Sequence, residues 1–293
     1  MAVHLWHAQA MSSVFPRSWR TWIYLFLTYV GARRLRALEA RRFGRWGIRV
    51  LAAALHGGTV HVGGSGPAFD LVLSSDHVAI DHVQGYGLVR GVLEPAVQEA
   101  LRRHVGPGTI VYDIGANIGF FSIFSARLAR PGGRVEAFEP VPASAAAIRA
   151  NAELNGLNAV RVHKVAVSDR AGSMKLWLPP ERSQAHLIDR GVRRDTEEAI
   201  EVPLVVLDDE IAAGRLPVPS VLKIDVEGSE IAVLRGLRRT LAAHDVVVVC
   251  ELHRTNAEVV AFAAELGYSV ENLESPAAVT DAGAVHVLIR RGQ

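Results

Sequence analysis

The sequence predicts an α/β protein built on a mainly parallel β-sheet with helices covering both faces. From residue 93 onward, short apolar runs typical of buried strands alternate with segments whose apolar residues show helical spacing. The first of these strands ends in a glycine-containing turn that opens a helix, and an acidic residue ends the next strand. With 49% hydrophobic residues, the 293-residue chain is long enough to bury a large core.

Charge is distributed unevenly along the chain, although the net charge is only +2. Residues 1–50 hold nine arginines and a single acid, Glu39, whereas the remaining chain holds 23 basic and 29 acidic residues. Because the basic character is confined to the N-terminal segment, the main domain is not expected to bind nucleic acid. A single cysteine, Cys250, excludes an intramolecular disulfide and predicts a cytoplasmic protein.

Residues 1–57 are expected to form a basic, apolar helical extension. About eleven largely apolar residues, 22–32, are too few for a membrane span, which needs roughly 20. A cleaved signal peptide is disfavoured because Arg33 and Arg34 follow this apolar run directly. The aromatic residues beside arginines in 17–49 suit peripheral contact with an anionic membrane, and the alternative is a helix that packs on protein.

Residues 58–92 are predicted to form a small β-meander, because three short β-like pieces are separated by Gly, Ser and Asp. The main domain then spans residues 93–293. Its helices are predicted at 94–105, 120–129, 142–156, 229–241 and 256–267. Its strands are predicted at 109–114, 133–139, 160–167, 220–226, 245–252, 268–273 and 284–291. Strands that alternate with helices in this way form parallel sheets.

The alternation breaks between residues 170 and 206. Two β-like pieces, 173–178 and 200–206, flank a polar loop with no periodic pattern. We interpret 170–206 as an inserted segment on the substrate side of the site.

The stretch VYDIGANIGFFS, residues 111–122, joins the first predicted strand to its helix. In open parallel sheets, ligands bind beyond the carboxyl ends of the strands, and glycines such as Gly115 and Gly119 let a ligand approach the backbone closely. Glu139 ends the next strand, where a carboxylate can accept two hydrogen bonds from a ribose diol. The pattern therefore indicates a nucleoside-containing ligand.

The residues of this loop distinguish between two classes of ligand. A dinucleotide fingerprint has the spacing G-x-G-x-x-G, whereas this loop has D-x-G-x-N-x-G, with Asp113, Gly115, Asn117 and Gly119. An acid at the strand end suits a pyrophosphate poorly. It suits a ligand with a cationic amine and a sulfonium, as in S-adenosylmethionine.

The chain resembles the FkbM-type methyltransferases over about residues 94–273. The resemblance rests on DIGANIGFFS, AFEP, VAVSD, LKIDVEGSEIAVLRG and VVVCELH. It implies a class I, Rossmann-like methyltransferase fold with a seven-stranded sheet in the order 3-2-1-4-5-7-6, the last strand antiparallel. It also implies S-adenosylmethionine as cofactor and, in most members, O-methylation of small molecules or glycans.

The resemblance also implies positions for the cofactor-binding residues. Asp113, Gly115, Asn117 and Gly119 would line the cofactor, and Glu139 would bind its ribose. Ser168 and Asp169, which follow the third strand, would lie by the adenine. For Asp169 the alternative is a turn residue without contact to a ligand.

Candidate catalytic residues lie at the ends of the next two strands, in KIDVEGSE (223–230) and CELH (250–253). An alcohol acceptor must lose its proton, so a general base assists methyl transfer. We predict that Asp225 and Glu251 line the cleft. His253 is the predicted base, since an unperturbed imidazole titrates near neutral pH.

The remaining acids of this region have structural alternatives. Glu230 is interpreted as a first-turn helix acid stabilised by the helix dipole, and Glu227 fits the start of the same helix equally well. Hard cations take carboxylate oxygens, so Asp225, Glu227 and Glu251 would suit a divalent metal. We do not expect one to be required.

The function predicted from the sequence is S-adenosylmethionine-dependent O-methylation of a hydroxyl on a small molecule, sugar or glycan. One alternative is a nicotinamide-dependent oxidoreductase, which Asn117 and the missing third fingerprint glycine disfavour. The other is a non-catalytic cofactor-binding or membrane-associated protein. Neither the acceptor nor the oligomeric state follows from the sequence.

Overall fold

The computed structural model describes residues 59–62, 71–74, 91–178, 186–187, 198–276, 278–279 and 286–292. The predicted helical extension over 1–57 and most of the predicted meander lie outside these residues. The chain divides into two compact units, one of residues 1–94 with 153–156 and one of 95–152 with 157–293. Among the described residues, no helix is both long and apolar enough to cross a membrane.

In the first unit, β1 (Thr59–His61) and β2 (Val72–Ser74) form an antiparallel pair. The Asn155 side chain donates to the carbonyl of Val72 at 2.6 Å and accepts from its amide at 2.8 Å. These strands agree with two of the three pieces of the predicted meander, whose third piece and outer limits stay a prediction.

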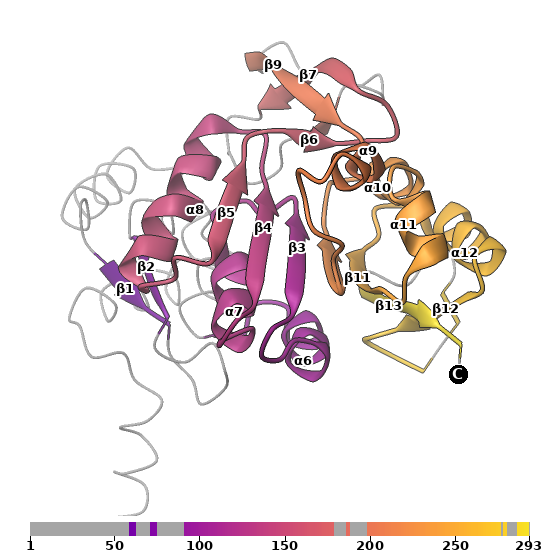
Figure 1. Cartoon of the computed structure of the whole chain (residues 1–293), viewed down its shortest axis with the longest axis horizontal. Helices are drawn as coiled ribbons and strands as arrows, with labels where there is room; N and C mark the ends of the chain where they lie inside the picture. Colours follow the sequence, from indigo (N-terminus) through magenta and orange to yellow (C-terminus); the bar gives the residue numbers. More distant parts are fainter. Residues whose placement is uncertain are drawn as a thin grey trace, which may run out of the picture. The chain divides into compact units, whose positions relative to one another are not determined.

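The second unit is built on a seven-stranded sheet in the order β12-β13-β11-β10-β3-β4-β5 (Figure 1). Its strands are β3 (Ile110–Ile114), β4 (Arg134–Phe138), β5 (Val160–His163), β10 (Val221–Ile224), β11 (Val247–Glu251), β12 (Tyr268–Asn272) and β13 (His286–Arg291). All neighbours pair in parallel except β13, which is antiparallel to both β11 and β12. This is the order, with an antiparallel last strand, that the family resemblance implies.

Helices cover both faces of this sheet, as the alternation along β3 shows. Tyr112 and Ile114 pack with residues of α10, α11 and α12, whereas Asp113 accepts a hydrogen bond from Ser122 of α7 on the opposite face. Ala137 of β4 packs with Ile148 of α8 on the α7 side. The helices are α6 (Pro95–His104), α7 (Phe120–Leu128), α8 (Pro142–Leu154), α9 (Leu207–Ala212), α10 (Glu230–Arg235), α11 (Arg238–Ala243) and α12 (Asn256–Glu265).

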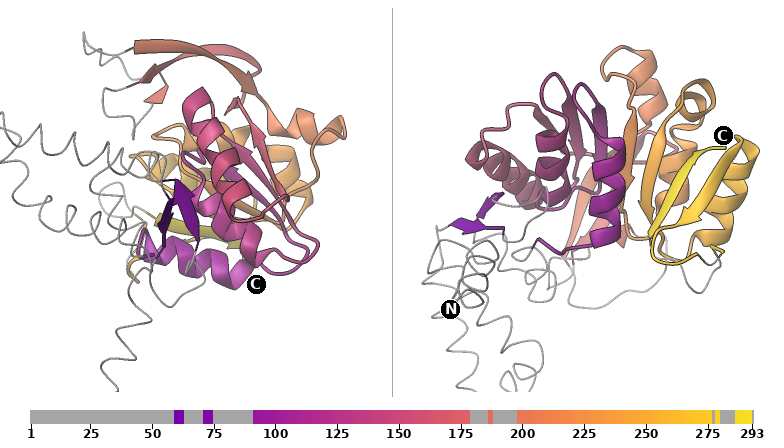
Figure 2. Two further views of the ribbon diagram at one scale, coloured as in Figure 1. Left: turned by 90° about the vertical axis from the view of Figure 1, so that its left-hand side faces the viewer. Right: turned by 90° about the horizontal axis from the view of Figure 1, so that it is seen from below.

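A second sheet has the order β6-β9-β7-β8, with β6 (Ala166–Val167), β7 (Gly172–Leu178), β8 (His186–Leu187) and β9 (Glu198–Val205). It has a small core of its own, made by Ala166, Leu176, Val202 and Leu204. Figures 1 and 2 show it beyond the carboxyl ends of β3, β4 and β5. The segment 170–206, interpreted as an insertion, therefore supplies most of this sheet.

Two predicted elements are wrong in detail. The strand predicted over 160–167 is two strands, because β5 pairs with β4 whereas β6 leaves the main sheet and pairs with β9. The helix predicted over 229–241 is broken at Gly236, where a β-carbon would lie 2.2 Å from the carbonyl oxygen of Ser168. The sequence prediction also missed α9.

The break between α10 and α11 is stabilised by Asp208 of α9. The Asp208 carboxylate is buried and accepts hydrogen bonds from the Arg239 amide at 2.7 Å and from the Thr240 amide at 2.9 Å. The Thr240 hydroxyl donates to it as well, at 2.6 Å. Asp208 thus accepts hydrogen bonds from two amides in the first turn of α11 that have no partner within the helix, and it links α11 to α9.

Substitution Asp208→Ala is expected to lower the free energy of unfolding by about 1–3 kcal/mol, since it removes a helix cap and leaves buried donors without partners. Urea denaturation followed by circular dichroism measures the loss. The control is Asp209→Ala, which removes an exposed ion pair with Arg239 and should change stability by less than about 1 kcal/mol. Equal midpoints for the two variants would contradict the capping role.

Candidate active site

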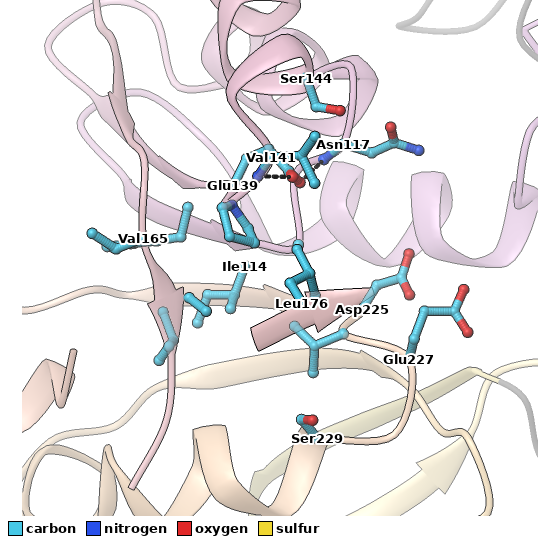
Figure 3. Close-up of a pocket in the computed structure, with 16 residues that line it drawn as sticks. Ile114, Asn117, Glu139, Val141, Ser144, Val165, Leu176, Asp225, Glu227 and Ser229 are labelled. Carbon is cyan, nitrogen blue, oxygen red and sulfur yellow. Dashed lines mark hydrogen bonds between the residues drawn. The ribbon is translucent and has the colours of Figure 1, made fainter. Parts of the chain in front are cut away.

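A pocket lies at the carboxyl ends of β3, β4 and β10, between the seven-stranded sheet and the smaller sheet (Figure 3). Residues 139–141 and 165–167 line one side, and residues 225–227 line another. Gly115 and Asn117 contribute from the β3–α7 loop, and Leu176 contributes from β7. Part of this space is open to solvent.

The β3–α7 loop has a backbone that its glycines make possible. Gly115 has a φ of 79°, and a β-carbon there would lie 1.7 Å from the carbonyl oxygen of Asp225. Gly119 has a φ of 87° and lies against Ile148, which a β-carbon would meet at 2.9 Å. Asn117, with a φ of 49°, adopts the same left-handed region. Side chains are thus excluded at 115 and 119, so the loop packs closely against β10 and α8.

Glu139 connects this loop to the end of β4. Its carboxylate is buried and accepts hydrogen bonds from the amides of Asn117 and Val141, each at 2.9 Å (Figure 3). Burial raises the pKa of Glu139 to about 7, although the two amide donors oppose the shift. The two amides fix the carboxylate at the pocket wall.

Asp113 does not line the pocket. Its side chain is buried, where it accepts a 2.6 Å hydrogen bond from Ser122 and lies 3.9 Å from the ammonium of Lys223. Lys223 is also buried and contacts Asp225 at 3.2 Å. Lys223 therefore lies between a carboxylate below the pocket and one that lines it.

A cluster of three glutamates surrounds His253, next to Asp225. His253 Nδ1 lies 2.9 Å from Oε1 of Glu230. The opposite ring nitrogen, Nε2, lies 3.4 Å from Glu227 and 3.5 Å from Glu251. Glu230 is fully buried, whereas the side chains of Glu227, Glu251 and His253 are 31%, 21% and 23% exposed. The cluster brings together the β10–α10 loop, helix α10 and the end of β11.

The cluster changes how its members titrate. Burial lowers the pKa of His253, but the hydrogen bonds to Glu230 and Glu251 and the nearby carboxylate charges outweigh it and raise that pKa to about 10. Burial likewise opposes ionisation of Glu230 and Glu251, yet contacts with His253 lower the pKa of both. The pKa of Glu227 is raised, mainly by burial. At neutral pH His253 is therefore an imidazolium, which does not suit the general-base role predicted for it.

The structure brings together four of the predicted site residues in the pocket lining: Gly115, Asn117, Glu139 and Asp225. Glu251 and His253 adjoin Asp225 without being part of that lining. Ser168 is buried and its amide bonds to the Val205 carbonyl, while Asp169 is exposed; neither lines the pocket.

Sequence reasoning missed the apolar lining by 165–167 and Leu176, and it missed the contact of Glu230 with His253. The apolar contribution of 165–167 follows from the split between β5 and β6, which no local signal marks. Glu230 looks like an ordinary helix-start acid in the sequence because its partners are 23 and 25 residues away.

Among the residues that the structure describes, Asp225, Glu251 and His253 form a group beside the pocket whose ligand atoms are close enough to hold a metal ion. The ligand atoms of Asp225, Glu251 and His253 lie within 4.8 Å of one another. The imidazolium of His253 already provides a positive charge for these carboxylates.

Residues 113–270 match the family model of the methyltransferase FkbM domain, which is more than half of the chain. The chain is 36% identical over 200 residues to the 31-O-demethyl-FK506 methyltransferase FkbM of Streptomyces tacrolimicus. That alignment covers 58% of this chain and 76% of the relative. The alternatives of an oxidoreductase and of a non-catalytic protein gain no support from these similarities.

Two further similarities are more distant. The hexuronic acid methyltransferase AglP of Haloferax volcanii is 27% identical over 145 residues, covering 49% of this chain and 56% of the relative. The solved structure of methyltransferase FkbM from Methylobacillus flagellatus is 15% identical, with a TM-score of 0.42, and covers 89% of this chain and 60% of that one. The family match and the first relative together establish that this chain belongs to the FkbM family of S-adenosylmethionine-dependent methyltransferases.

Proposed function

We propose that the pocket binds S-adenosylmethionine and that the enzyme O-methylates a hydroxyl group of a small molecule or sugar. The observation that carries the cofactor assignment is the carboxylate of Glu139, held at the pocket wall by the amides of Asn117 and Val141. Each of its oxygens keeps lone pairs for the two hydroxyls of a ribose. Support for the acceptor class comes from the named substrates of the relatives, a demethylated natural product and a hexuronic acid.

The residues of the pocket fit this cofactor. Gly115 lets the β3–α7 loop lie directly against the end of β10, and this packing places Gly115 and Asn117 in the pocket lining. The apolar residues 165–167 and Leu176 offer a surface for a flat ring, and Asp225 offers a carboxylate to a cationic group. Gly119 and Asp113 act below the pocket, by shaping the loop. Ser168 and Asp169 do not line the pocket, so we assign them no contact with the cofactor.

S-adenosylmethionine supplies a methyl group bonded to a positively charged sulfur. When bound, it would give this methyl group to the acceptor oxygen, and the sulfur would keep the electron pair of the broken carbon–sulfur bond. Positioning the acceptor is the main task of such an in-line displacement. The hydroxyl proton must also go to a base.

We assign Glu227 as the base that accepts this proton. Its carboxylate lines the pocket beside Asp225, and burial raises its pKa, which makes it a stronger base than an ordinary glutamate. His253 and Glu251 complete the site as a charged pair: the imidazolium lies 3.4 Å from Glu227 and favours the ionised form of that carboxylate. His253 is therefore proposed to support the base, and Asp225 to orient the bound molecules.

Substitution Glu139→Gln is expected to weaken binding of S-adenosylhomocysteine by about 10- to 100-fold, because the amide has one acceptor oxygen instead of two charged ones. Isothermal titration calorimetry measures the dissociation constant. Glu258→Gln, on the exposed face of α12, is the matched control. If Glu139→Gln binds S-adenosylhomocysteine as tightly as the wild type does, Glu139 does not bind the ribose.

The same assignment predicts a pH dependence of binding. Hydroxyl donors favour the ionised carboxylate, and the pKa of Glu139 is about 7 in the free protein, so S-adenosylhomocysteine should bind more weakly as the pH falls through 7. Binding should also release protons, which makes the measured enthalpy depend on the buffer near pH 7. Glu139→Gln should show neither effect, and a pH-independent affinity in the wild type would contradict the proposal.

Substitution Glu227→Gln is expected to lower the maximal rate of methyl transfer by about 100-fold or more, with little change in S-adenosylhomocysteine affinity. The rate is measured as incorporation of labelled methyl groups into the small-molecule fraction of a cell extract from the source organism. Mass spectrometry of the labelled product identifies the acceptor atom. A label on nitrogen or carbon would contradict O-methylation, and an unchanged rate would exclude Glu227 as the base.

We further propose that methyl transfer needs no divalent metal, because the imidazolium of His253 already balances the carboxylates around it. Dialysis against EDTA should leave the rate of label incorporation unchanged. A loss of activity that added Mg²⁺ or Mn²⁺ restores would instead identify Asp225, Glu251 and His253 as metal ligands.

A further inference from the structure

Glu230 is a buried carboxylate near the pocket, and both of its oxygens have hydrogen-bond partners. Its side chain has 0% exposure, although it lies in the first turn of α10. Its Oε1 accepts from the Gly228 amide at 2.6 Å and faces His253 Nδ1 at 2.9 Å, while Oε2 accepts from the Thr255 hydroxyl at 2.8 Å. An acid that served only the helix dipole would be stabilised equally well at the surface. The burial of Glu230 therefore has another cause.

These hydrogen bonds join two segments that are distant in the sequence. The Gly228 amide belongs to the β10–α10 loop, where Glu227 and Gly228 have φ angles of 51° and 97°. A glutamate with a positive φ is uncommon and must be held by its surroundings. His253 and Thr255 belong to the segment between β11 and α12. One carboxylate thus fixes the loop that carries Glu227 and the segment that carries His253.

The orientation of the His253 ring follows from the same contact. With Nδ1 directed at Glu230, the ring presents Nε2 to Glu227 at 3.4 Å and to Glu251 at 3.5 Å. Asp225 also has an oxygen within 4.8 Å of the ligand atoms of Glu251 and His253. Beyond Glu251, the ring of His286 lies 3.7 Å from its second oxygen. The groups that face His253 are thus mainly carboxylates, and Glu230 decides which ring nitrogen each one meets.

We propose that Glu230 is a positioning residue for methyl transfer. Its buried carboxylate holds Glu227 and the His253 ring at a fixed distance and orientation relative to each other. The inference rests on the proposed role of Glu227 as the base. Glu230 does not touch the acceptor or the cofactor. It acts by fixing the distance between the Glu227 carboxylate, in the β10–α10 loop, and the His253 imidazolium, in the segment between β11 and α12.

Substitution Glu230→Gln tests this role, because glutamine keeps the shape of the side chain and removes its charge. The pKa of His253, measured by NMR titration of the ring in the full chain, should fall. Once Glu230 no longer fixes the His253 ring 3.4 Å from Glu227, Glu227 should hold its proton to higher pH, so the acidic limb of the maximal rate should move upward. The rate of label incorporation into the cell extract at pH 7 should fall about 10- to 100-fold, while the KM for S-adenosylmethionine stays within about twofold.

Thr255→Val provides a second variant in case Glu230→Gln does not fold. It removes one hydrogen bond to Glu230 and keeps the charge, so the maximal rate should fall several-fold with an unchanged affinity for S-adenosylhomocysteine. Asp209→Ala, on α9, is the control, and it should leave the rate of methyl transfer unchanged.

Two results would overturn the proposal: a His253 pKa that Glu230→Gln leaves unchanged, or a maximal rate and pH profile that both variants leave unchanged. The proposed base itself is tested separately by Glu227→Gln. If that variant keeps its rate, Glu227 is not the base, whereas the NMR titration still reports whether Glu230 holds His253.

Discussion

The site depends on the close approach of two backbone segments, the β3–α7 loop and the end of β10. A β-carbon at position 115 would lie 1.7 Å from the Asp225 carbonyl oxygen, so the loop can lie against β10 only if residue 115 is glycine. The amides of Gly115 and Ala116 both donate to the carbonyl of Phe138, which ties the same loop to the end of β4. This packing places the Asn117 amide beside Glu139 and leaves Asp225 facing the pocket. Three strands are thus joined around one residue without a side chain.

A second constraint is the placement of charge in a largely apolar sheet. Ionised groups are costly to bury unless they are paired, and each buried charge near the pocket has an opposite charge or several donors beside it. Lys223 lies between Asp113 and Asp225, and His253 lies among three glutamates. Neither cation is part of the pocket lining. The surface itself keeps Glu139, Asp225 and Glu227, all acids.

The fold and one part of the pocket lining could be predicted from the sequence because their signals are local. The strand, the glycine turn and the helix over 110–128 are contiguous, and Glu139 ends the next strand, so Gly115, Asn117 and Glu139 follow from one short pattern. The behaviour of His253 did not follow, because its pKa depends on three glutamates that only the tertiary structure brings together. The helix break at Gly236 likewise depends on a distant carbonyl, that of Ser168. Asp113 and Lys223 are register partners on neighbouring strands and so share a face, and only the tertiary packing shows that this face turns toward α7.

The smaller sheet has a consequence for how this enzyme can change. Its core of Ala166, Leu176, Val202 and Leu204 is separate from the core of the seven-stranded sheet, yet Leu176 reaches the pocket. Mutations in separately packed cores have nearly additive effects on stability. Side chains of β7 can therefore be exchanged, by evolution or by directed libraries, with little disturbance of Gly115, Glu139 or Glu227. The architecture separates the part that must remain constant for the shared chemistry from a part that is free to diversify.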